Sequence, residues 1–106
     1  MSNADRKAEF ERIVARLIEL GASRIVLFGS RARGDFRSDS DYDLIVVMAS
    51  DEAASYASRL ATLYEAVVPR IAIDMVVYTP SEFERLSRER PFVRRAVREG
   101  RLLHAA

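Results

Sequence analysis

Two aspartates at the start of an apolar run have the residue type and the spacing to bind a metal ion. Asp41 and Asp43 stand two residues apart, so a strand there would place both carboxylates on one face. Like charges at that separation repel, and a divalent cation between them would relieve the repulsion. Carboxylate oxygens suit Mg²⁺, which is commonly held by one or two carboxylates together with substrate phosphates. The alternative interpretation is a solvated acidic loop over 38–41.

A third candidate is Asp74, in the middle of the apolar run 71–78. An ionised carboxylate in a buried strand costs several kcal/mol unless it is paired or metal-bound, so we expect a compensating group. If this strand lies beside the strand of Asp41 and Asp43, Asp74 can serve as a shared metal ligand or as the general base for an attacking hydroxyl. The alternatives are an ion pair with an arginine and an edge-strand position that faces water.

Gly29 and Ser30 follow the apolar run 24–28 and open a short helix-compatible segment. The backbone N–H groups of such a turn, together with the serine hydroxyl, can bind a phosphate. A plain strand-ending turn for the glycine and a helix cap for the serine are the alternatives. Of the arginines that follow, Arg33 is the candidate for a charge-assisted contact with a triphosphate.

A small mixed sheet would bring these residues together. Apolar runs predict strands at 24–28, 41–48 and 71–78, and the end of the chain at 101–104 is interpreted as a last short strand or a tail. Helical spacing predicts helices over 5–20 and 50–68, from Pro80 onwards, and from Pro91 to Gly100. Helices that alternate with strands predict a single α/β domain over residues 1–106.

Local capping signals predict where two of these helices begin. Ser50 is the predicted cap of helix 50–68, with Asp51 and Glu52 in its first turn. The stretch 79–82 matches a capping box with proline at the first helical position. Within helix 50–68, two tyrosines at helical spacing, Tyr56 and Tyr64, are interpreted as packing residues.

Composition excludes several classes of function. A chain of 106 residues has room for one domain, so we expect any second half of an active site to come from elsewhere. The net charge of +1 argues against strong nucleic-acid binding. With no cysteine and only His104, a metal site must use carboxylates. No apolar stretch approaches the roughly 20 residues of a membrane span, and we expect a cytoplasmic protein without a membrane partner.

Charge is unevenly distributed along the chain. Residues 82–101 hold seven arginines and four acids, whereas residues 38–52 hold five acids and no basic residue. An arginine-rich helix could bind an acidic partner or the nucleotide, and a solvated helix face is the alternative.

The spacing of the glycine and aspartate motifs resembles a known signature. Gly29-Ser30, ten further residues and then Asp41-Tyr42-Asp43 resemble the Gly-Ser-x10-Asp-x-Asp pattern of the DNA polymerase beta nucleotidyltransferase superfamily. The longer strings 28–34 and 40–44 are most similar to the minimal nucleotidyltransferases, small prokaryotic proteins often paired as antitoxins with HEPN-domain toxins. The likeness spans roughly residues 10–104.

The resemblance implies a role for each matched residue. Gly29 and Ser30 would hold the nucleotide phosphates, Asp41 and Asp43 would bind two Mg²⁺ ions, and Asp74 would be the third acid, on its own strand. It further implies transfer of AMP from ATP to a tyrosine of a HEPN toxin, in a hetero-oligomer of antitoxin and toxin. Two alternatives stay open: an antitoxin that neutralises its partner by binding alone, and a small-molecule nucleotidyltransferase that works as a homodimer.

Overall fold

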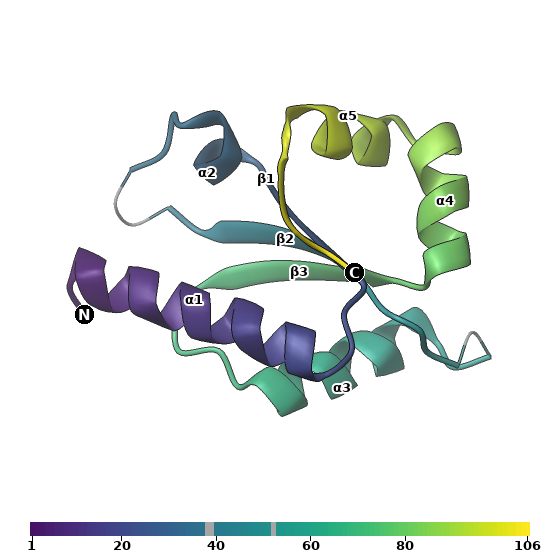
Figure 1. The fold of residues 1–106 in the computed structure, drawn as a ribbon, viewed down its shortest axis with the longest axis horizontal. Helices are drawn as coiled ribbons and strands as arrows, with labels where there is room; N and C mark the ends of the chain where they lie inside the picture. The colour runs from purple at the N-terminus through teal and green to yellow at the C-terminus, as the bar shows by residue number, and fades with distance from the viewer. Residues whose placement is uncertain (38–39, 52) are drawn as a thin grey trace.

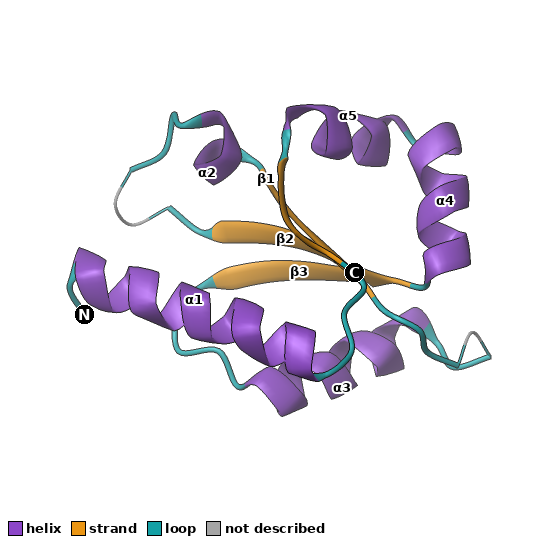
Figure 2. Ribbon diagram, in the orientation of Figure 1, coloured by secondary structure: helices purple, strands orange, loops and turns teal. Residues whose placement is uncertain are grey.

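The computed structural model describes residues 1–37, 40–51 and 53–106, which form five helices and four strands (Figures 1 and 2). In chain order these are α1 (Asn3–Glu19), β1 (Arg24–Phe28), α2 (Ser30–Arg33), β2 (Tyr42–Val47), α3 (Tyr56–Val67), β3 (Ile73–Tyr78), α4 (Pro80–Glu89), α5 (Pro91–Glu99) and β4 (Arg101–Ala105). Among the described helices, none has both the length and the apolar composition that crossing a membrane requires.

The four strands form one mixed sheet in the order β3-β2-β1-β4. β1 is antiparallel to both β2 and β4, whereas β2 and β3 run parallel. The predicted α/β fold with a small mixed sheet is therefore confirmed. The last residues form a strand rather than a tail, with His104 paired to Ile25 of β1.

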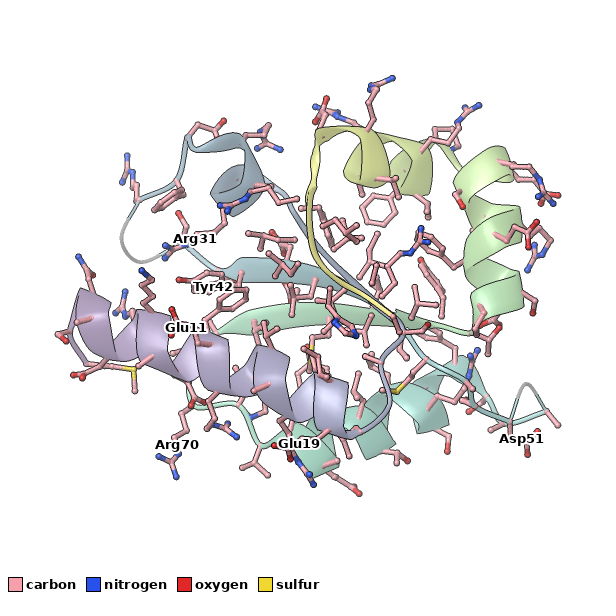
Figure 3. The ribbon with its side chains drawn as sticks, in the orientation of Figure 1. Glu11, Glu19, Arg31, Tyr42, Asp51 and Arg70 are labelled. Atoms are coloured by element: carbon pink, nitrogen blue, oxygen red, sulfur yellow. The ribbon has the colours of Figure 1, made fainter. Side chains whose placement is uncertain are left out.

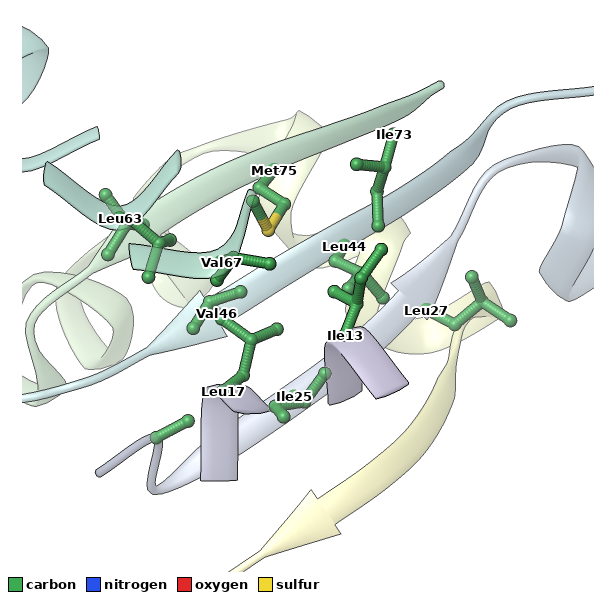
Figure 4. Close-up of a cluster of buried hydrophobic side chains, with 12 residues drawn as sticks. Ile13, Leu17, Ile25, Leu27, Leu44, Val46, Leu63, Val67, Ile73 and Met75 are labelled. Carbon is green, nitrogen blue, oxygen red and sulfur yellow. The ribbon is translucent and has the colours of Figure 1, made fainter. Parts of the chain in front are cut away.

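Helices cover both faces of the sheet (Figure 1). On one face, α1 and α3 pack on the sheet around a core that includes the fully buried Ile13 and Leu17 (Figure 4). On the other face, α4 and α5 enclose a smaller core with Phe83 and Val93 at its centre. Truncation of a fully buried aliphatic side chain to alanine lowers the free energy of unfolding by about 2–5 kcal/mol. Packing in these two layers therefore stabilises the sheet whose strand ends carry the candidate site.

A buried ion pair of α1 joins this helix to the end of α3. Glu9 is 7% exposed and accepts bonds of 2.6 and 2.9 Å from Arg12 and of 2.7 Å from the Arg70 backbone N–H. Arg12 also donates to the carbonyls of Val67 and Val68, at 3.1 and 3.0 Å. These carbonyls lie at the end of α3, where a helix has no further N–H groups to donate to them. Arg12 supplies the missing donors.

The third helix begins later than predicted. Its cap is Ser55, whose hydroxyl accepts a 3.1 Å bond from the backbone N–H three residues further on, and not Ser50. The Asp51 carboxylate instead accepts from the Ala53 N–H at 2.9 Å, an Asx-type bond that holds a turn. Glu52, which we predicted in the first helical turn, lies outside the described residues.

The capping box predicted for α4 is confirmed in both directions. The Thr79 hydroxyl accepts from the Glu82 N–H at 3.2 Å, and the Glu82 carboxylate accepts from the Thr79 N–H at 2.9 Å. Glu82 also receives two bonds from Arg59 of α3, at 2.7 and 3.0 Å. The Arg59 guanidinium is the main reason why the pKa of Glu82 falls to about 2.

Candidate active site

The residues singled out from the sequence meet at one end of the sheet. Gly29 and Ser30 directly follow β1, while the strands that carry Asp43 and Asp74 both begin at this end. Phe28, the last residue of β1, pairs with Asp43 across the antiparallel ladder. The end of one strand and the starts of two others therefore bring segments that are far apart in the sequence into one place.

Asp43 and Asp74 are direct neighbours across two parallel strands. The register pairs Asp43 with Asp74, Leu44 with Met75 and so on along the ladder. Because side chains alternate along a strand, Asp43 shares its face with Ile45, which lies in the core under α4 and α5. Asp41 immediately precedes β2 and is exposed.

Gly29 is in contact with the carboxylate of Asp43. Its backbone angles, φ 74° and ψ −158°, belong to a region that only glycine adopts readily. A Cβ atom built on Gly29 would overlap the Asp43 Oδ2 atom. The Gly29 carbonyl accepts from the N–H groups of Ala32 and Arg33, at 3.1 and 3.2 Å, and so starts α2. The glycine is thus required for close approach as well as for the turn.

Burial and two neighbouring acids raise the pKa of Asp43, which forms an acidic cluster with Asp41 and Asp74. Burial is the largest cause, followed by the negative charges of Asp74 and Asp41 and by a hydrogen bond with Asp74. The positive charge of Arg33 acts in the opposite direction. The Asp43 carboxylate therefore stands among like charges, a situation that a bound cation would relieve.

The donor set fits a hard cation that takes part of its ligands from a substrate. Within residues 1–37, 40–51 and 53–106, no three acidic, histidine or cysteine side chains are gathered closely enough to hold a metal ion by themselves. Asp43 and Asp74 do lie side by side with Asp41 nearby, and Mg²⁺ is commonly held by one or two carboxylates plus phosphate oxygens. The arrangement suits a cation that arrives with a nucleotide.

Our reason for expecting a partner for Asp74 was wrong. We expected its carboxylate to be buried in an apolar strand, but β3 is an edge strand and Asp74 is exposed. The charge therefore carries little desolvation cost, and the alternative, an edge-strand position that faces water, is the observed one. The expectation that the strand of Asp74 lies beside that of Asp43 is confirmed by the parallel register.

A hollow of about 260 Å³ opens beside the glycine turn, between α2 and α5. Its lining includes Gly29, Arg33 and, from α5, Phe92 and Arg95. Arg33 is exposed and forms a 3.3 Å ion pair with Asp35, an interaction that contributes little at the surface. The hollow therefore combines two guanidinium groups, the rings of Phe28 and Phe92 and the Glu99 carboxylate on the side of the sheet where Asp43 lies.

A column of aromatic rings and one arginine holds the strand that carries Asp43, and the sequence analysis missed it. Phe10 of α1 stacks on Tyr42, with ring centroids 4.0 Å apart and an 11° interplanar angle. Arg31 lies over Tyr42, at 4.3 Å from the ring (Figure 3). The same guanidinium lies 4.3 Å from the ring of Phe36 and donates to the Ser40 carbonyl. Alternation along the strand could have shown that Tyr42 faces away from its aspartate neighbours, but not which residues it meets.

A larger groove of about 500 Å³ lies on the α1 side of the sheet, opposite to the side of Asp43. Its walls combine aromatic, aliphatic and charged residues: Asn3, Arg6, Lys7, Phe10, Glu11, Leu27, Arg31, Phe36, Tyr42, Arg101 and Leu103. This larger groove and the acidic cluster are therefore on different faces of the sheet. We assign the chemistry to the acidic cluster because carboxylates, and not volume, can hold a cation.

Comparison with known proteins finds a matching family and a similar protein. Residues 7–104 match the family described as "Nucleotidyltransferase domain". A Methanocaldococcus jannaschii protein named "Putative protein adenylyltransferase MJ0141" is 26% identical over 78 residues, which cover 67% of this chain and 79% of the relative.

Two solved structures share the fold. One, a "putative nucleotidyltransferase from Sulfolobus solfataricus", superposes with a TM-score of 0.62 at 24% identity and covers 78% of this chain and 75% of that one. The other, a "toxin-antitoxin with AMP-PNP", superposes with a TM-score of 0.52 at 23% identity and covers 91% of this chain and 73% of that one.

Proposed function

The chain belongs to the nucleotidyltransferase-domain family, and we propose that it transfers AMP from ATP to a hydroxyl group of a protein partner. The observation that carries this proposal is the register of Asp43 and Asp74 beside the glycine turn. The name of the Methanocaldococcus relative supports adenylyl transfer to protein. The neighbour that was solved as a toxin-antitoxin with AMP-PNP supports an adenine nucleotide and a toxin as partner.

Each residue of the site has a task in this reaction. We assign Asp41 and Asp43, with Asp74 as a shared ligand, to hold two Mg²⁺ ions together with the nucleotide. The Gly29–Ser30 turn would bind the nucleotide phosphates through backbone N–H groups. The bound ions supply positive charge that stabilises the attacking and leaving oxygens. Arg33 adds a guanidinium beside the same turn.

The transfer itself is an in-line displacement at the α-phosphorus. The acceptor oxygen forms a bond to phosphorus and loses its proton to Asp74, directly or through a water molecule. The bond between the α-phosphorus and the bridging oxygen breaks, and pyrophosphate leaves with that electron pair. Positioning of the reactants and neutralisation of charge supply most of the rate in such a reaction.

The open position of Asp74 suits an acceptor that belongs to another protein. Asp74 is exposed on the edge strand, so a side chain on the surface of a partner can approach it without entering a closed pocket. We propose a tyrosine of a HEPN-type toxin as acceptor, and neutralisation of that toxin as the result. The antitoxin and toxin would then form a hetero-oligomer.

Intact-mass spectrometry of the partner tests this function. The protein encoded beside this chain is co-expressed with the wild type, with Asp43→Asn and with Asp51→Asn, a matched loss of charge at an exposed aspartate outside the acidic cluster. We expect one or more AMP increments on the partner with the wild type and with Asp51→Asn, and none with Asp43→Asn. An unmodified partner that co-purifies with all three variants would instead support neutralisation by binding alone.

A further inference from the structure

The outer edge of β3 is closed by tyrosine side chains of α3. β3 is the last strand of the sheet on its side, so the backbone groups on its outer edge have no strand to pair with in the described sheet. The Tyr64 hydroxyl donates to the Ile73 carbonyl at 2.9 Å and accepts from the Met75 N–H at 3.0 Å. The Tyr56 hydroxyl accepts from the Val77 N–H at 3.3 Å. The two phenols thus hydrogen-bond backbone groups of β3 that a neighbouring strand would otherwise bind.

The two groups bound by Tyr64 flank Asp74. Ile73 and Met75 are the residues immediately before and after it, so one hydroxyl fixes the backbone on both sides of the third carboxylate. The Asp74 side chain is exposed, and it hydrogen-bonds with Asp43 of the neighbouring strand. Its place beside Asp43 also depends on the backbone of an edge strand, which would otherwise be held on one side only.

The tyrosine itself stands on a well-anchored helix. Tyr64 is half-buried and packs against the core, to which the same helix contributes the buried Leu63 and Val67. The end of α3 is fixed by Arg12, through the two carbonyl contacts described above, and by a 3.3 Å bond from Arg16 to the Ala66 carbonyl. The position of the hydroxyl is thus set by α1 and by the core.

We propose that Tyr64 is a positioning residue for Asp74: its hydroxyl holds the edge strand so that the third carboxylate stays aligned with Asp43. This inference rests on the proposed function, in which Asp74 receives the acceptor's proton or shares a metal ion. It assigns to Tyr64 a role beyond the packing that its helical spacing indicates.

The test compares Tyr64→Phe with a matched control. Tyr56→Phe removes the same hydroxyl from the same helix and from the same strand edge, but its bond lies three residues away from Asp74. Loss of two hydrogen bonds that align a reacting group should lower kcat about tenfold in Tyr64→Phe, while KM for ATP stays within about twofold because the Gly29–Ser30 turn is untouched. Tyr56→Phe should keep kcat within about twofold of the wild type.

Two further measurements do not depend on turnover. Amide hydrogen exchange should become faster at Met75 in Tyr64→Phe and at Val77 in Tyr56→Phe, which shows that each phenol protects its own amide. Mn²⁺ affinity in the presence of a non-hydrolysable ATP analogue should fall in Tyr64→Phe alone. If Tyr64→Phe fails to fold, p-aminophenylalanine at position 64 keeps a donor for the Ile73 carbonyl but is a poor acceptor for the Met75 N–H. It should lower kcat severalfold and make hydrogen exchange at Met75 faster, and wild-type kcat with faster exchange would overturn the positioning role.

The outcomes separate this inference from the proposed function. Wild-type kcat in Tyr64→Phe, or equal losses in both variants, would overturn the positioning role. If the wild-type protein transfers no nucleotide to its partner, the proposed function fails, and Mn²⁺ affinity then decides: a loss in Tyr64→Phe alone upholds the role of Tyr64, and unchanged affinity rejects it.

Discussion

At the scale of single residues, the site depends on contacts that residue type alone does not specify. Gly29 could be predicted to end a strand, but its contact with Asp43 depends on the antiparallel register that places Phe28 opposite that aspartate. The alternation Asp41-Tyr42-Asp43 is visible in the sequence, and it separates the acids from the tyrosine that stacks on Phe10. A one-residue shift in register would move every one of these side chains to the wrong face.

Alanine at Gly29 should damage the site far more than alanine at Gly34. Both glycines have positive φ, 74° and 82°, but an added Cβ would overlap the Asp43 carboxylate at Gly29 and meets nothing within 4 Å at Gly34. We expect Gly29→Ala to lower the free energy of unfolding by about 2–3 kcal/mol and to abolish transfer, and Gly34→Ala to cost about 1 kcal/mol. Urea unfolding and a transfer assay check both. Equal effects of the two substitutions would contradict the contact.

At the scale of elements, α1 organises the part of the molecule that presents Asp74. Its residues Glu9 and Arg12 bind the end of α3 and the segment before β3, and α3 in turn holds the edge of β3. The sequence predicts these helices and strands, because their apolar periodicity is strong. The sequence does not show that β3 lies at an edge of the sheet, because an apolar run has the same pattern in a central strand and in an edge strand.

Acid should weaken the junction between α1 and α3. The bond from Arg12 is the main reason why the pKa of Glu9 falls from 4.5 to about 2. A carboxylate whose pKa is lower in the folded than in the unfolded state stabilises the fold above about pH 4.5, and this contribution is lost as the pH falls towards 2. Urea unfolding at a series of pH values should therefore show a decreasing free energy of unfolding between about pH 5 and pH 2.

Glu9→Gln should remove part of that pH dependence. The substitution should lower the free energy of unfolding at pH 7 by about 1–3 kcal/mol, because the buried acceptor loses its charge. The control is Glu19→Gln, at an exposed acid of the same helix that pairs with Arg16 at 3.3 Å, and it should behave like the wild type. A Glu9→Gln curve that runs parallel to the wild-type curve down to pH 2 would show that Glu9 is not the titrating group.

At the scale of the whole molecule, the fold was more predictable than the site. The α/β class, the mixed sheet and the capping box of α4 follow from periodicity and local chemistry in the sequence. The sequence also indicates which aspartates meet. The burial expected for Asp74 is wrong, because this residue is exposed on an edge strand, and no pattern indicates the Tyr64 hydroxyl at that edge. Those features arise from tertiary neighbours that no local pattern encodes.

If this site transfers a nucleotidyl group, the phosphate that becomes attached to the acceptor must be the α-phosphate of the nucleotide. The purified protein and its partner are incubated with Mg²⁺ and with ATP labelled in either the α- or the γ-phosphate. We expect the α-label to become covalently bound to the partner, the γ-label to remain unbound, and pyrophosphate to be released in equal amount. Transfer of the γ-label, or nucleotide binding without transfer of either label, would contradict nucleotidyl transfer by this site.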